Sequence, residues 1–167
     1  MAMRLFCCTL TLLLCTLTAG NALAEHRLGG GVNYWVMLKD LDDKDFDDKG
    51  LSYLVSYQYW KGPFGVELAG ELLPKRLDET ALAPQAYLLF GGTLYAGGGI
   101  GIIYSDGDFA KQPFFALKAG VNLELIPHTF VDISANYRFS NKEDLRDETK
   151  GVDTDTVFLG AAFRFAL

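Results

Sequence analysis

The sequence has few cysteines and histidines, and their positions limit the chemistry open to it. All three cysteines, Cys7, Cys8 and Cys15, lie near the N-terminus. The two histidines are His26 and His128. If the N-terminal segment is removed, the rest of the chain has no thiol. That excludes a disulfide framework and a cysteine-ligated metal site from the remaining chain.

Acidic residues outnumber basic residues, and the sequence has no long apolar run after its N-terminal segment. The chain carries 15 Lys and Arg against 21 Asp and Glu, with a formal net charge of −6. An acidic chain without a Lys/Arg cluster argues against a nucleic-acid partner. After Ala24, no apolar run approaches the roughly 20 residues of a membrane-spanning helix. Within lipid, only helices and closed β-barrels satisfy the hydrogen bonds of every backbone N–H and C=O group. If this part of the chain enters a membrane, it must therefore do so as a closed β-sheet.

The N-terminal segment has the three parts of a secretory signal. Arg4 gives a basic start, and residues 5–17 form an uncharged apolar stretch. Ala22 and Ala24 then place small residues where a signal peptidase reads them. The pattern predicts a cleaved signal peptide over residues 1–24. The alternative, an N-terminal membrane helix, needs a longer apolar run, and no cysteine at the cleavage point is available for a lipid anchor.

Residues 25–167, the expected mature domain, alternate between apolar and polar side chains. Over residues 51–59, aliphatic and aromatic side chains alternate with Ser52, Ser56 and Gln58. A period of two places successive side chains on opposite faces of a strand. The pattern predicts eight strands, of which 83–90 is the least regular because residues 87–90 are all large and apolar. The eight are 27–38, 51–59, 64–72, 83–90, 93–104, 113–124, 129–139 and 156–167.

The connections between these strands alternate in length. The short ones contain turn residues and cover 61–63, 91–92 and 125–128. The long ones are charged and cover 39–50, 73–82, 105–112 and 140–155. Short turns at one end and long polar loops at the other are typical of outer-membrane barrels, with the turns in the periplasm.

A soluble β-sandwich or ligand-binding barrel would show the same alternation with its faces reversed. Period two alone does not tell the inside from the outside. Small residues dominate the polar face, and aromatic residues gather near both strand ends, which favours a membrane barrel with two aromatic girdles. The turn-end girdle would hold Tyr57, Tyr59, Trp60, Phe64, Phe163 and Phe165, and the loop-end girdle Tyr34, Tyr53, Tyr104, Phe115, Tyr137 and Phe139.

These residues resemble the small OmpA-type and OmpX-type outer-membrane barrels. The glycine-rich run 95–101 is similar to their strands. Gly160, Phe163 and Phe165 are similar to the terminal signal read by the barrel-assembly machinery, with Leu167 where an aromatic residue is commoner. The resemblance implies an all-β fold, an eight-stranded antiparallel up-and-down transmembrane β-barrel. It also implies integral localisation in a Gram-negative outer membrane, with its lipid, its lipopolysaccharide and the assembly machinery as partners.

Seven charged side chains fall on the predicted inward face. Because a small barrel is filled by its own side chains and an unpaired buried charge is costly, we expect them to form a salt-bridge network. The alternative is an ion-conducting or gated path. The predicted network comprises Glu67, Glu71, Lys118, Glu124, Asp132, Arg138 and Arg164.

The first long loop is rich in aspartate and raises the question of a divalent cation site. Asp43, Asp45 and Asp47 have the spacing of calcium ligands. An EF-hand would need glycine at Asp48 and a glutamate at Leu54. A solvated acidic loop is the favoured interpretation, with the three aspartates as a weak metal candidate.

Some small barrels are lipid-modifying enzymes. Ser140, Asn141 and Glu143 resemble part of the site of a lipid A deacylase. That pattern requires a histidine where Arg138 stands, and a general base is needed for such chemistry. The sequence therefore predicts no enzyme and no cofactor. It predicts a structural or surface-interaction barrel with at most narrow solute permeability, and the alternatives are a lipid-modifying enzyme and a soluble periplasmic ligand-binding barrel.

Overall fold

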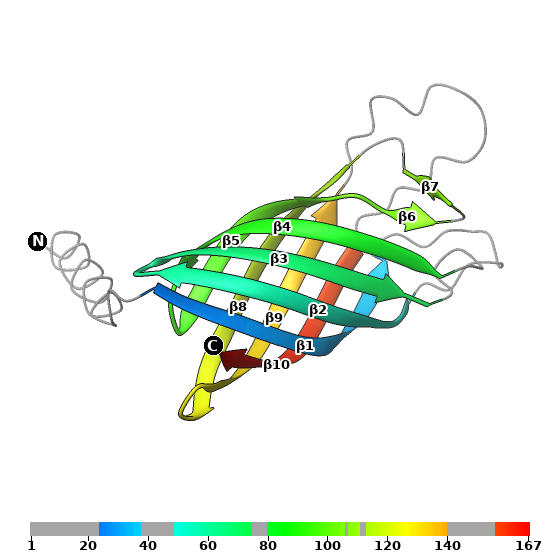
Figure 1. Ribbon diagram of the computed structural model, residues 1–167. Helices are drawn as coiled ribbons and strands as arrows, with labels where there is room; N and C mark the ends of the chain where they lie inside the picture. The colour runs from blue at the N-terminus through cyan, green and yellow to red at the C-terminus, as the bar shows by residue number, and fades with distance from the viewer. Residues whose placement is uncertain (1–23, 38–48, 75–79, 106, 111–112, 140–155) are drawn as a thin grey trace, which may run out of the picture.

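The computed structural model is a closed β-barrel of eight long antiparallel strands (Figure 1). It describes residues 24–37, 49–74, 80–105, 107–110, 113–139 and 156–167. Each long strand pairs with its neighbour in the chain, and β10 pairs with β1 to close the wall. The strands are β1 (Ala24–Met37), β2 (Lys49–Lys61), β3 (Phe64–Leu73), β4 (Ala81–Gly91), β5 (Leu94–Gly101), β8 (Phe114–Ile126), β9 (Thr129–Phe139) and β10 (Thr156–Ala166).

This architecture confirms the predicted eight-stranded up-and-down barrel. One predicted strand differs, because 93–104 divides into β5 and the two-residue strand β6 (Tyr104–Ser105). β6 forms a small hairpin with β7 (Asp108–Phe109) and pairs with β4 through Tyr104 and Leu82. No helix in the described ranges is long and apolar enough to cross a membrane.

The three predicted short turns lie together at one end of the barrel (Figure 1). Gly62 and Gly91 have positive φ angles of 59° and 136°, and His128 has a φ of 65°. The Gly91 amide donates to the Pro63 carbonyl at 2.8 Å, which joins two of the turns. The Leu167 amide donates to the His26 carbonyl at 2.8 Å, so the last residue also lies at this turn end.

The faces of the wall have the polarity of a membrane barrel rather than of a soluble one. Outward apolar side chains are widely exposed, for example Leu88 at 71%, Val55 at 65% and Leu159 at 58%. Inward polar side chains such as Gln58 and Glu67 are 0% exposed. The structure therefore supplies the inside and outside assignment that alternation alone left open.

One expectation about a large side chain was wrong, and the predicted strand with the least regular sequence pattern is present as β4. Trp60 is 5% exposed and lies in the lumen, where its indole nitrogen donates to Gln58 Oε1 at 3.0 Å, so it is not part of the turn-end girdle. Its position in β2 has the parity of Gln58, which turns inward. β4 does alternate in space, since Tyr87 and Leu89 are buried in the lumen and Leu88 is exposed.

Candidate functional site: the barrel lumen

Six of the seven predicted charged residues meet in the middle of the lumen. They come from four strands, β3, β8, β9 and β10, and all are at most 5% exposed. The three acids are matched by three bases, so the group carries no net formal charge. We refer to this group as the lumen network, and its members are Glu67, Glu71, Lys118, Asp132, Arg138 and Arg164.

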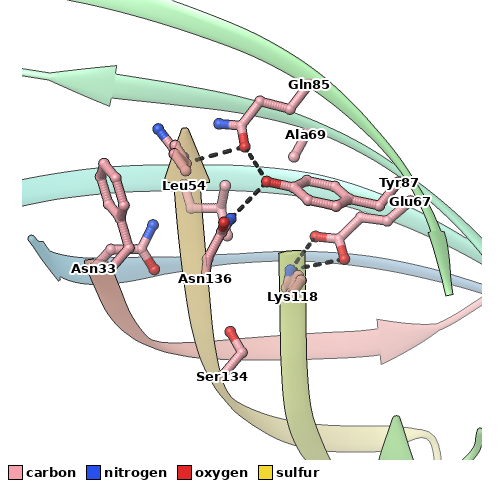
Figure 2. Close-up of a pocket in the computed structure, with 11 residues that line it drawn as sticks. Asn33, Leu54, Glu67, Ala69, Gln85, Tyr87, Lys118, Ser134 and Asn136 are labelled. Carbon is pink, nitrogen blue, oxygen red and sulfur yellow. Dashed lines mark hydrogen bonds and ion pairs between the residues drawn. The ribbon is translucent and has the colours of Figure 1, made fainter. Parts of the chain in front are cut away.

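Glu67 on β3 binds two cations at once. Lys118 on β8 places its Nζ 2.8 and 2.9 Å from the two carboxylate oxygens (Figure 2). Arg164 on β10 places Nη2 3.3 Å from Oε1. Gln58 on β2 donates its amide to Oε2 at 3.0 Å. One carboxylate therefore joins strands from opposite parts of the wall.

Asp132 on β9 extends this part of the network toward the turn end. Its Oδ2 lies 3.6 Å from Arg164 Nε. The Tyr95 hydroxyl on β5 donates to the same carboxylate, 2.9 Å from Oδ2. Arg164 also donates from Nη1 to the Ser56 hydroxyl. Arg164 thus contacts both Glu67 and Asp132 from the last strand.

Glu71 is the second acidic centre. It lies four residues after Glu67 on β3 and is therefore nearer the loop end. It forms an ion pair with Arg138 on β9 and accepts a hydrogen bond from Ser52. Asn33 Nδ2 donates to Oε1 at 2.6 Å, and Gln85 Nε2 donates to Oε2 at 2.9 Å. Four donors on one carboxylate satisfy it in a site that water does not reach.

Tyr87 on β4 joins the Gln85 and Asn136 side chains (Figure 2). Its hydroxyl donates to Gln85 Oε1 at 2.5 Å and accepts from Asn136 Nδ2 at 2.5 Å. Its ring centroid lies 5.3 Å from Lys118 Nζ. The sequence did not identify Gln85, Tyr87 or Tyr95 as members of the lumen hydrogen-bond network. The signal that could have done so was their inward position in the alternation of each strand.

The lumen network leaves little open space. The cavity between its side chains has a volume of about 10 Å³, lined by Glu67, Gln85, Lys118 and Arg138 among others. That volume is roughly what one water molecule requires. Paired buried charges offset their desolvation cost only when their geometry and hydrogen bonds are good. All four carboxylate oxygens of Glu67 and Glu71 accept hydrogen bonds. On the cationic side, Nε and Nη1 of Arg138 and Nε of Arg164 are buried without a hydrogen-bond partner. The arrangement acts as a structural plug.

Aromatic side chains close the lumen on the loop side of the plug. Trp35 and Phe158 are each 1% exposed, and Phe114 is 6% exposed. The Arg138 guanidinium carbon lies 3.7 Å from the Phe158 ring centroid and 5.0 Å from that of Phe114. A cation held against aromatic faces is stabilised by the ring quadrupoles. Charge pairing and aromatic packing therefore meet at Arg138.

The turn end of the lumen is open. A vestibule of about 640 Å³ lies there, between the turns and the plug. Glu124, the seventh predicted network residue, lines this vestibule and is exposed, so its assignment to the network was wrong. Its carboxylate accepts a hydrogen bond from the His128 amide at 3.1 Å. A register shift between Glu124 and Ile126 interrupts the regular ladder here, at the end of β8.

The residues of the predicted assembly signal lie on β10 and beyond its end. Phe163 and Phe165 are exposed on the outside of the wall, at 57% and 55%. Leu167, beyond the end of β10, is 81% exposed and lines the vestibule at the turn end. Gly160 leaves space on the lumen side, because a Cβ there would lie 2.0 Å from Asn33 Oδ1. A glycine at 160 therefore lets Asn33 reach Glu71.

The remaining candidate sites gain no support from the lumen geometry. Asp43, Asp45 and Asp47 lie outside the described residues, as do Ser140, Asn141 and Glu143. Among the described residues, no group of three or more His, Cys, Asp and Glu side chains could hold a metal ion. His26 is exposed, with Nδ1 2.5 Å from the Tyr57 hydroxyl. Arg138 belongs to the plug, as described above.

Comparisons with known proteins agree with this fold. No protein-family model matches the sequence, and no curated protein does. The structure is similar to Neisserial surface protein A, with a TM-score of 0.58 at 11% identity, covering 85% of this chain and 96% of that one. It is also similar to the N-terminal β-barrel domain of Pseudomonas aeruginosa OprF, with a TM-score of 0.55 at 10% identity, covering 87% and 100%.

A de novo designed transmembrane β-barrel is similar as well, with a TM-score of 0.51 at 11% identity, covering 86% of this chain and 95% of that one. At such low identities, the architecture is what these proteins share with this chain. The chain therefore has the fold of the small eight-stranded outer-membrane β-barrels.

Proposed function

We propose that this protein is an integral, non-enzymatic protein of the bacterial outer membrane with a structural or surface-interaction role. One observation carries the proposal: the exposed face of the closed wall is apolar, and the charged face is buried. Leu117 on β8 is 57% exposed, whereas the next residue, Lys118, is 5% exposed. Lipid supplies the environment that such an outer face requires.

A soluble periplasmic barrel does not fit the same observation. Monomeric soluble proteins rarely expose contiguous apolar patches of more than a few hundred Å². Here apolar side chains are exposed on every long strand of the wall, including Val32 on β1, Leu68 on β3 and Ile133 on β9. Such a surface would associate or aggregate in water.

Export and assembly follow from the sequence signals. In the proposal, the segment 1–24 directs secretion and is removed, and residues 25–167 form the mature domain. The assembly machinery reads Gly160, Phe163, Phe165 and Leu167 at the end of the chain. The apolar wall then contacts lipid and lipopolysaccharide, with the turns in the periplasm and the acidic loops outside.

The lumen favours a structural or surface role over solute transport. Eight strands enclose an interior just wide enough for side chains, and here paired charges and aromatic rings fill it. In the proposal, contact with other molecules falls to the loop sequences, which include six aspartates in 40–48. A general diffusion pore would need open space that the plug occupies.

Membrane fractionation tests the proposal. We expect a tagged chain expressed in a Gram-negative host to sediment with the outer membrane, to resist extraction by high salt, and to migrate differently on a gel before and after boiling. A periplasmic protein and a known outer-membrane barrel serve as fractionation controls. Recovery of the mature protein in the periplasmic supernatant would refute the proposal.

A further inference from the structure

The vestibule at the turn end has the dimensions of a small-molecule site. Its volume of about 640 Å³ lies within the roughly 300–1,000 Å³ range of ligand pockets. The buried side chains of Trp60 and Phe130 line it together with polar groups of the lumen wall and the turns.

Asn122 on β8 lines this vestibule with an amide that no protein group satisfies. The residue is 4% exposed, and neither Nδ2 nor Oδ1 has a hydrogen-bond partner. Its backbone amide donates to the Thr93 carbonyl at 2.7 Å, which fixes the backbone of this residue beside the β4–β5 turn. A buried polar group without a partner is costly, so the side-chain amide favours any partner with a complementary donor and acceptor.

Arg27 on β1 supplies a second unsatisfied donor, and its side chain is held in place. Its guanidinium carbon lies 3.7 Å from the Phe130 ring centroid, and Nη2 lies 2.8 Å from Glu25 Oε2. Nε is buried and has no hydrogen-bond partner. Phe130 and Glu25 also line the vestibule. Because Nε is buried in this position, the Arg27 side chain must shift for a ligand in the vestibule to reach it.

We propose that the vestibule binds a small amide-bearing ligand, either a short peptide or an N-acetylated sugar, through the side chains of Asn122 and Arg27. An amide offers the complementary pair, one N–H for Asn122 Oδ1 and one C=O for Asn122 Nδ2 or Arg27 Nε. In this proposal the Asn122 side chain turns toward the open space when the ligand binds. The vestibule faces the periplasm only if the turns lie on the periplasmic side, which is part of the proposed function.

NMR titration of the ¹⁵N-labelled protein in detergent micelles tests this inference. The probes are N-acetylglucosamine and N-acetylalanine methylamide, and glucose is the control without an amide. We expect saturable shifts at vestibule residues with at least one amide probe and none with glucose. The responding probe identifies a sugar or a peptide as the source of the amide. Because micelles replace the membrane, this result does not depend on where the protein resides.

Substitutions in the vestibule wall complete the test. We expect Asn122→Leu to weaken binding at least tenfold, and Thr93→Val, which changes the same wall but keeps the amide, to bind within twofold of the parent. Asn122→Asp, which loses the amide donor, serves if the leucine variant does not fold. Equal shifts with glucose, no saturable shift with either amide probe, or unchanged binding by the Asn122 variants would each overturn the proposal.

Discussion

At the residue scale, Glu67 is the side chain on which most of the plug depends. It pairs with Lys118 and Arg164 and is 0% exposed. Removing its charge leaves two cations facing one another in a space that holds about one water. A buried charge that loses its partner is far more costly than a surface charge that does so.

We expect Glu67→Gln to lower the free energy of unfolding by about 3–5 kcal/mol, the usual cost of breaking a buried ion pair. Urea titration of the protein folded in lipid vesicles measures this free energy. Glu124→Gln is the matched control, because Glu124 lies exposed in the vestibule, and it should change stability by less than about 0.5 kcal/mol. Equal stability of the two variants would show that the plug does not stabilise the barrel.

The sequence was informative about which residues turn inward and less so about their partners. Alternation placed Glu67, Arg138 and Arg164 on one face, and the structure brings them into ion pairs. Asn136 and Tyr87 lie 49 residues apart, and no local pattern shows that they touch. The error at Glu124 concerns its depth in the barrel and not its face. Parity turns it inward, but it lies at the open turn end, where it lines the vestibule instead of reaching the network.

At the scale of elements, the contact between β4 and β5 explains why the least regular predicted strand still fits. Tyr87 on β4 is paired with Gly99 on β5. A Cβ at Gly99 would lie 2.3 Å from the Tyr87 ring and 2.5 Å from the Ala86 carbonyl oxygen. The glycine therefore leaves the space that an inward tyrosine needs. Residues 87–90 show no apolar–polar alternation in the sequence, because the glycines paired with them on β5 leave room for large side chains on both faces of β4.

We expect Gly99→Ala to destabilise the barrel by about 1–3 kcal/mol, as overpacking does in dense interiors. Gly70→Ala is the control, since a Cβ at Gly70 would meet nothing within 4 Å. That change should be neutral or stabilising by up to about 1 kcal/mol. Thermal unfolding followed by gel mobility measures both. A Gly99→Ala variant as stable as the parent would contradict the packing described for Tyr87.

At the scale of the whole molecule, the lumen has two different ends. A vestibule of about 640 Å³ opens at the turn end, whereas about 10 Å³ remains within the plug. The strand count and loop lengths predicted the barrel from the sequence. The one-sided opening was not predictable, because it depends on how far Trp35, Phe114 and Phe158 reach across the interior.

We expect the purified protein to give no lasting conductance in a planar bilayer, because the plug occupies the only path along the axis that the described residues outline. The reference is the same bilayer without protein. Steady openings of the size of a general pore would contradict the plug. Such a result would leave the barrel fold intact and would change only the account of its interior.

Lipid contact with the outer wall is the central claim, and tryptophan fluorescence tests it most directly. The chain's two tryptophans, Trp35 and Trp60, both lie in the lumen. We predict that brominated lipids quench the parent protein weakly and Leu117→Trp strongly, since Leu117 is exposed on the outer face of β8. Strong quenching of the parent, with no added quenching in Leu117→Trp, would contradict the outward apolar face and the membrane barrel built on it.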